Sequence, residues 1–143
     1  MTSNAERAAV LARAIEASVS GDSSVICDMY TEDVQGWSPA MCISSTAELA
    51  VELEDRESEF SDVDLKLEPL NVGGDHACVE WVASGTHSGP VEGDDESMIE
   101  AAGRRFTLYG ITIAEFTGRR ICAFREYWSE VGLLDQLQLL PRD

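Results

Sequence analysis

The chain has 143 residues, the length of one domain with a single hydrophobic core, so we expect one domain over residues 1–143. Its 27 acidic and 10 basic residues give a formal net charge of −17, which repels nucleic-acid phosphates and anionic lipid headgroups and excludes both as expected partners. No apolar run approaches the ~20 residues that cross a bilayer, and no signal pattern opens the chain, so we expect a cytoplasmic protein.

Two helices are predicted at the start of the chain. Residues 5–19 repeat apolar side chains at helical spacing, and Gly21 supplies the residue that commonly follows a helix end. Asp22 or Ser23 can then cap a shorter second helix, whose apolar edge reaches Tyr30. Both helices are amphipathic, so each has one face that suits a core.

A strand or loop and a third helix follow. Residues 33–38 indicate a short strand or loop, which Pro39 ends. Ser45 and Glu48 have the spacing of a capping box, in which two side chains satisfy the first free amides of a helix. Apolar residues continue at near-helical intervals as far as Phe60, which predicts a third helix before the sheet begins.

The first strands of a sheet are predicted next. Residues 62–68 alternate apolar and charged side chains, which is the period of a strand with one wet face. Residues 77–84 also have one apolar face and form a second strand after a Gly-Gly-Asp turn. Residues 91–103 are acidic and show no useful period, so we expect a mobile loop there.

The last part of the chain predicts two long strands over residues 104–117 and 119–129, joined by a tight turn. Residues 130–137 then indicate a terminal helix or turn. Helices followed by a run of antiparallel strands are typical of an α+β fold.

A single acid on a largely apolar strand is the first chemical candidate. Glu115 shares one face of the strand 104–117 with Tyr109 and two isoleucines, and the opposite face is apolar as well. Burying an unpaired carboxylate is costly and is typical of functional sites, so we interpret Glu115 as a catalytic candidate. The alternative is that it lies wetted near the strand end or pairs with Arg119 or Arg125.

The following strand extends this candidate site. Its period places Arg125, Tyr127 and Ser129 on one side, and a tight turn brings that strand close to Glu115. We therefore predict a polar track along a cavity wall, with these four residues as the catalytic set. The alternative is structural, with Arg125 as the partner of Glu115 and Tyr127 as a half-buried aromatic residue whose hydroxyl is satisfied.

Three stretches carry a family resemblance: Gly-Thr-His-Ser-Gly over 85–89, Gly-Arg-Arg over 103–105, and the closing run from Arg125 to Pro141. They resemble the SnoaL-like polyketide cyclases of the nuclear transport factor 2-like superfamily, from about Asp33 onward. The resemblance implies a cone-shaped curved antiparallel sheet wrapped around the N-terminal helices, with an internal pocket and a homodimer. It also implies cofactor-independent acid/base chemistry on an apolar, polyketide-like carbonyl or epoxide compound, by a cyclase, hydrolase or isomerase.

One departure from the family concerns the catalytic acid. Ser129 stands where the resembling family usually has an aspartate that acts as acid and base, and a serine hydroxyl needs activation to do this. The candidate substitutes are Glu115, Glu126, Glu80 and Asp33. The alternative is a non-catalytic small-molecule-binding or accessory protein that has lost the aspartate.

The predicted substrate-binding residues combine aromatic or soft side chains, which suit a flat apolar ligand, with a few polar ones. They are Tyr30, Asp33, Trp37, Met41, Glu80, Trp81, His87 and Tyr109. His87 has two interpretations, a proton shuttle or a structural ring that bonds the backbone of its glycine-rich turn. The sequence has two histidines without metal spacing and no phosphate-binding loop, so we expect neither a metal nor a cofactor.

Overall fold

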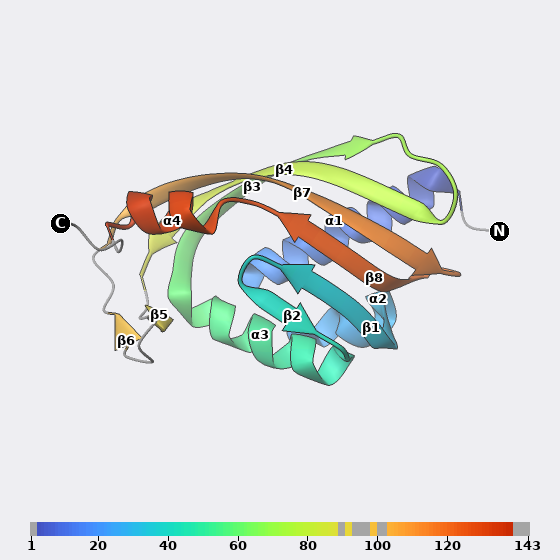
Figure 1. Cartoon of the computed structure of the whole chain (residues 1–143), viewed down its shortest axis with the longest axis horizontal. Coiled ribbons are helices and arrows are strands. Elements are labelled where there is room, and N and C mark those ends of the chain that lie inside the picture. The colour runs from blue at the N-terminus through green and yellow to red at the C-terminus, as the bar shows by residue number, and fades with distance from the viewer. Residues whose placement is uncertain (1–2, 89–90, 93–97, 100–102, 139–143) are drawn as a thin grey trace.

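A curved sheet of six strands holds helices against its concave side in the computed structural model, which describes residues 3–88, 91–92, 98–99 and 103–138 (Figure 1). The strand order is β2–β1–β8–β7–β4–β3. Neighbouring strands are antiparallel except β1 and β8, which run parallel. The expected α+β fold with a curved sheet around helices is confirmed, and the sheet is mixed rather than wholly antiparallel.

The elements follow the predicted order. The helices are α1 (Asn4–Ser20), α2 (Ile26–Met29) after a 3₁₀ turn (Ser23–Val25), α3 (Thr46–Glu59) and α4 (Glu130–Gln136). The strands of the large sheet are β1 (Tyr30–Ser38), β2 (Met41–Ile43), β3 (Phe60–Leu70), β4 (His76–His87), β7 (Arg105–Thr117) and β8 (Arg120–Tyr127). No helix within the described residues is long and apolar enough to cross a membrane.

The segment expected to be a mobile acidic loop is described only in part. Within 91–103, β5 (Val91–Glu92) pairs with β6 (Met98–Ile99) as a separate two-stranded sheet. Apart from Gly103, the rest of that segment lies outside the described residues.

Side-chain caps and a glycine fix the helix boundaries where the sequence indicated them. Gly21 ends α1 in the left-handed conformation with φ of 76°, which glycine adopts without steric cost. The Ser45 hydroxyl accepts the Glu48 N–H at 3.2 Å and so begins α3. The Glu48 carboxylate accepts from the N–H of Ser44 at 3.0 Å, one residue before the usual capping-box partner.

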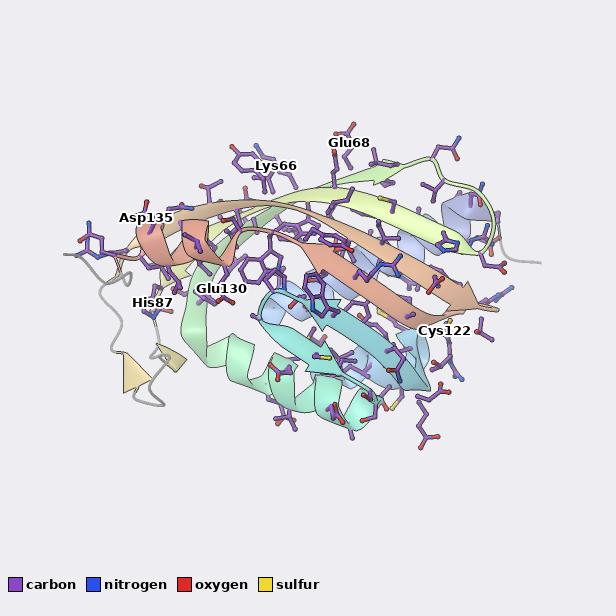
Figure 2. The ribbon with its side chains drawn as sticks, in the orientation of Figure 1. Lys66, Glu68, His87, Cys122, Glu130 and Asp135 are labelled. Atoms are coloured by element: carbon purple, nitrogen blue, oxygen red, sulfur yellow. The ribbon has the colours of Figure 1, made fainter. Side chains whose placement is uncertain are left out.

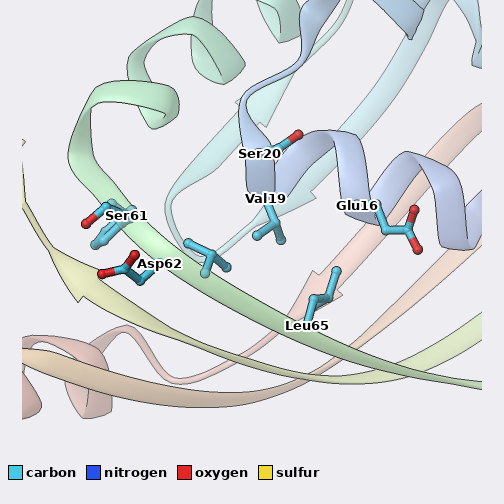
Figure 3. Close-up of a pocket in the computed structure, with 8 residues that line it drawn as sticks. Glu16, Val19, Ser20, Ser61, Asp62 and Leu65 are labelled. Atoms are coloured by element: carbon cyan, nitrogen blue, oxygen red, sulfur yellow. The ribbon is translucent and has the colours of Figure 1, made fainter.

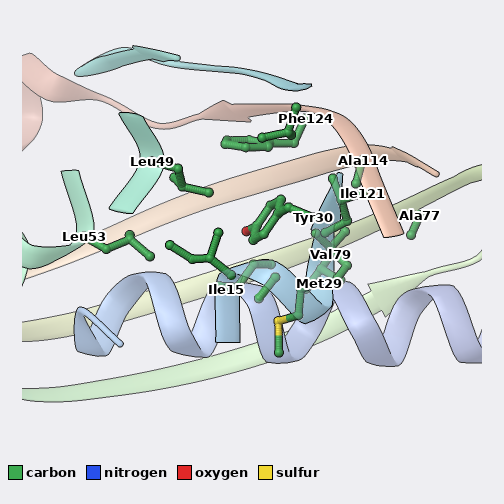
Figure 4. Close-up of a cluster of buried hydrophobic side chains, with 14 of the residues drawn as sticks. Ile15, Met29, Tyr30, Leu49, Leu53, Ala77, Val79, Ala114, Ile121 and Phe124 are labelled. Carbon is green, nitrogen blue, oxygen red and sulfur yellow. The ribbon is translucent and has the colours of Figure 1, made fainter. Parts of the chain in front are cut away.

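The core lies between the concave side of the sheet and the helices (Figure 4). Ile15 of α1, Leu49 and Leu53 of α3, and Phe124 of β8 point into this space and are almost fully buried. Burying a large apolar side chain contributes about 1.5–3 kcal/mol, so this cluster is the main force that closes the sheet over the helices.

A glycine lets one large aromatic residue lie flat against the sheet. A side chain at Gly110 of β7 would place its Cβ 2.2 Å from the Trp81 ring, closer than real contacts allow. Because Gly110 has no Cβ, the indole of Trp81 crosses β7, and its Nε1–H donates to the Thr112 hydroxyl at 2.9 Å. The buried indole N–H is thereby satisfied on the inner wall.

Candidate functional site

A pocket of about 320 Å³ lies between the last turns of α1 and the first residues of β3 (Figure 3). Its apolar lining residues are Val19, Phe60, Val63 and Leu65, and its polar lining residues are Glu16, Ser20, Ser61 and Asp62. A hollow of this size is large enough for a small molecule, and its lining is half polar and half apolar. The sequence-based site set contains none of these residues.

An irregularity in β3 shapes one side of the pocket. The pairing of β3 with β4 shifts between Ser61 and Asp64, and Asp62 within that shift has a φ of 52°. A positive φ is uncommon outside glycine, and aspartate is among the residues that tolerate it. Such bulges bend a strand and redirect its side chains, and here Val63 within the bulge and Leu65 beyond it line the pocket.

His87 lies fully buried at the end of β4, beside this pocket. Its ring centroid is 6.1 Å from that of Phe60, which lines the pocket and also packs edge-on against Phe106 at 5.1 Å. Figure 2 places His87 at the end of the sheet that carries α4, away from the β7–β8 hairpin at Cys122.

The ring of His87 has unused hydrogen-bonding capacity. Neither Nδ1 nor Nε2 has a hydrogen-bond partner among the described residues, whereas the backbone N–H of His87 donates to the Arg104 carbonyl at 2.9 Å. Within the described residues, the ring of His87 makes no hydrogen bond to the backbone of its turn. A buried polar group left unsatisfied costs about 1–3 kcal/mol, and each such group in a native structure calls for a reason. A bound ligand that fills one or both positions would be such a reason.

The inner side of the sheet holds four of the predicted substrate-binding residues: Tyr30, Met41, Trp81 and His87, each no more than 9% exposed. Tyr30 packs against the Phe124 ring at 5.9 Å, and Trp81 is held by Thr112. Tyr30, Met41 and Trp81 belong to the packed core, and none of the four lines the pocket between α1 and β3.

The other predicted site residues lie away from the core. They are Asp33, Trp37, Glu80, Tyr109, Glu115, Arg125, Tyr127 and Ser129. Glu115 alternates with the buried Ala114 and Phe116, and Arg125 follows the buried Phe124. The expected polar track along a cavity wall is therefore wrong in orientation, because the Tyr109 face of β7 is the outer face.

Glu115 has a different partner from either arginine that the sequence suggested. Its carboxylate lies 3.2 Å from Nε2 of His76, its direct neighbour on β4, and both side chains are about two-fifths exposed. A pair with this much exposure contributes little to stability, because solvent screens it. The geometry gives Glu115 a surface partner rather than a place in the interior.

Ser129 begins the last helix. Its hydroxyl accepts the Gly132 N–H at 2.9 Å, so it is the N-cap of α4, and its side chain is exposed. The position at which the resembling family has aspartate thus serves here as a helix start. Serine and aspartate are both good N-cap residues, so this role alone does not require an acid.

Glu126 is the acid of β8 that takes the inner side. It alternates with the exposed Arg125 and Tyr127, and its partner on β7 is Thr112, which is 2% exposed and on the inner face. The sequence interpretation ranked Glu126 behind Glu115 because it lies opposite Ser129. The burial of Phe124 reverses that ranking, since it identifies the Glu126 face as the inner one.

Two further groups of side chains bear on the chemistry, the possible metal ligands and the buried thiol of Cys78. In the part of the chain that the structure describes, no three histidine, cysteine or acidic side chains are placed to hold a metal ion. Burial raises the pKa of the Cys78 thiol, and the nearby Glu80 carboxylate raises it further. The thiol therefore stays protonated at neutral pH and is a poor nucleophile.

Comparisons with known proteins agree with this fold. The family model described as SnoaL-like polyketide cyclase matches residues 8–137. Among solved structures, TsrD from Streptomyces laurentii is 24% identical with a TM-score of 0.81, covering 98% of this chain and 100% of TsrD. AclR from Streptomyces galilaeus is 22% identical with a TM-score of 0.78, covering 98% of this chain and 89% of AclR.

A more distant structural neighbour is an LEH-like epoxide hydrolase from M. tuberculosis. It is 13% identical with a TM-score of 0.69, and the match covers 94% of this chain and 91% of that protein. No curated protein sequence matches. At these identities the structural neighbours establish the fold, whereas a reaction has to be argued from the site.

Proposed function

Because this chain belongs to the family of SnoaL-like polyketide cyclases, we propose that it is a cofactor-independent enzyme that moves protons on an apolar, polyketide-like carbonyl compound. The observation that carries the proposal is His87, whose buried ring has an unused donor and an unused acceptor within the described residues, beside a pocket with both apolar and polar lining residues. General acid/base catalysis needs such a group within hydrogen-bond reach of the substrate.

The proposed reaction uses one imidazole as base and then as acid. The substrate enters between α1 and β3 and moves the Phe60 ring away from His87. A ring nitrogen accepts a proton from the carbon beside a carbonyl, and the enolate attacks a second carbonyl carbon of the same molecule. The protonated ring then returns the proton to the new alkoxide, so the enzyme ends unchanged.

Three matched acid and base variants test this assignment. Against a panel of linear poly-β-carbonyl substrates, His87→Gln is expected to lower kcat by about 10²–10⁴-fold, the usual contribution of a general base. Glu126→Gln tests the inner acid of β8, and Glu115→Gln tests the outer acid that the sequence suggested. The proposal fails if Glu115→Gln abolishes turnover while His87→Gln leaves it intact.

A second function is favoured by one observation, the use of Ser129 as the cap of α4 in place of a free acid. A chain without a carboxylate at this position could bind a small apolar molecule without converting it. That alternative gains support if a ligand binds to the pocket and no member of the substrate panel is turned over.

The outer side of the sheet is the proposed homodimer surface. It carries exposed large aromatic residues: Trp37 at 43%, Tyr127 at 45% and Tyr109 at 73% exposure. The tilted rings of Trp37 and Tyr127 lie against each other with centroids 5.4 Å apart, so they offer one continuous area. Exposed clusters of this kind are typical of protein–protein contacts, and a second copy is the partner that the family resemblance implies.

A further inference from the structure

The pocket between α1 and β3 carries two carboxylates that nothing within the described residues neutralises. Glu16 lies on α1 and Asp62 on the bulge of β3, and both line the pocket. Neither has an ion pair or a hydrogen bond with another described residue. Figure 3 places them on opposite sides of Val19 and Leu65, so an apolar strip separates two negative ends.

This arrangement selects a ligand by charge as well as by apolar surface. The chain has a net charge of −17, so an anionic molecule is repelled both by the whole protein and by the two local carboxylates. A neutral apolar molecule gains only the contact with Val19, Phe60 and Leu65. A molecule with an apolar body and a protonated amine gains that contact and one or both charge pairs.

We propose that this pocket binds an amphipathic amine, an apolar molecule that carries at least one ammonium group. Its apolar body lies along Val19 and Leu65, and the ammonium group meets the carboxylate of Asp62 or Glu16. That the same molecule is the substrate, an amine-bearing carbonyl compound, rests on the proposed function. The binding preference itself does not.

The test compares three probes of equal chain length, n-octylammonium, n-octanol and octanoate, titrated into the full chain at pH 7 and followed by calorimetry. Octylammonium is expected to bind about tenfold more tightly than octanol, and octanoate more weakly than both. Raising the salt from 20 to 500 mM should shrink the ammonium preference, since the ions screen the partly exposed carboxylates.

Charge-neutral variants test whether the preference for octylammonium depends on Glu16 and Asp62. Glu16→Gln and Asp62→Asn should each reduce the preference for octylammonium, and the double variant should remove it. Asparagine tolerates the positive φ at position 62 as aspartate does, so the backbone is preserved. Asp64→Asn is the matched control, because Asp64 lies on the same strand with the same charge but outside the pocket. Equal binding of octylammonium and octanol, or an equal loss in Asp64→Asn and Asp62→Asn, overturns the proposal.

His87→Gln separates this inference from the proposed reaction. The variant should keep the parent chain's ratio of octylammonium to octanol affinity, because that charge preference rests on Glu16 and Asp62 and His87 does not line the pocket. One outcome is that Glu16→Gln and Asp62→Asn reduce the preference for octylammonium while His87→Gln leaves turnover unchanged. In that case the proposed reaction fails and the amine site stands. If His87→Gln abolishes turnover and no probe is preferred, the reaction stands and the amine site fails.

Discussion

At His87 the requirements of stability and of ligand binding oppose each other. The ring is fully buried against Phe60, yet its two nitrogens make no hydrogen bond within the described residues. A residue kept for packing alone would be better replaced by an apolar one, because an unsatisfied polar group in the interior costs free energy.

The variant His87→Leu tests whether His87 lowers stability while serving the ligand. Removing the unsatisfied nitrogens is expected to leave the free energy of unfolding unchanged or to raise it by about 1 kcal/mol, while ligand turnover is lost. Urea denaturation provides the first value and the substrate panel the second. Thr112→Val serves as the contrast, because it removes the acceptor of the buried Trp81 N–H and should destabilise the chain by about 1–3 kcal/mol. A loss of stability in His87→Leu as large as in Thr112→Val would contradict a ligand-binding role.

Single residues also mark the limit of what the sequence predicts about the site. The alternation along β7 and β8 was predicted correctly, and Trp81, Met41 and Tyr30 were expected at an apolar wall, where they lie. The choice of the inner face was wrong, because the Tyr109 face of β7 looks as apolar in sequence as the Phe106 face. Only packing distinguishes the two, through features such as the room that Gly110 leaves for Trp81.

Among the helices, α4 bears on the departure from the family, because it begins at Ser129, the residue that stands in place of the family's aspartate. Its first turn is capped by Ser129, and near its end the Gln136 side chain bonds β7 twice, accepting from the N–H of Thr107 at 2.7 Å and donating to its carbonyl at 2.9 Å. The Ser129 cap and the two hydrogen bonds from Gln136 to Thr107 together hold α4 against β7. The capping box of α3 and the glycine that ends α1 were predictable from the sequence because they are local. The pocket was not, because it depends on the bulge at Asp62 meeting α1 across 40 residues of chain.

Ser129→Ala and Ser129→Asp separate capping from catalysis. The alanine variant removes the acceptor for the Gly132 N–H and should lower the free energy of unfolding by about 0.5–2 kcal/mol, whereas aspartate keeps the cap and should match serine. Ser88→Ala, an exposed serine outside any cap, is the control and should have no effect. New cyclase activity in Ser129→Asp would place the family's acid in a working pocket. Equal stability of the alanine variant and the parent would refute the cap.

At the scale of the whole molecule, the concave side and the outer side of the sheet differ in what they contact. The concave side is filled by α1, α3 and the core, with the pocket at the edge where β3 meets α1. On the outer side, Lys66 and Glu68 of β3 project into solvent, as Figure 2 shows, while the β7–β8–β1 half carries the exposed aromatic residues. A charge of −17 on each copy opposes self-association, so a dimer has to gain enough from this aromatic area to overcome the repulsion.

Tyr109→Arg tests the dimer directly. The parent chain should have twice its own mass of 15.6 kDa by sedimentation equilibrium in 150 mM salt, and its dimer should weaken at low salt, where the repulsion between two acidic copies is less screened. Tyr109→Arg places a charge within the proposed contact and should shift the protein to a single copy. Val51→Arg, which adds the same charge to an apolar residue 58% exposed on α3, is the matched control and should stay dimeric. A single-copy parent chain, or a Tyr109→Arg variant that sediments as two copies, would remove this face as the dimer surface.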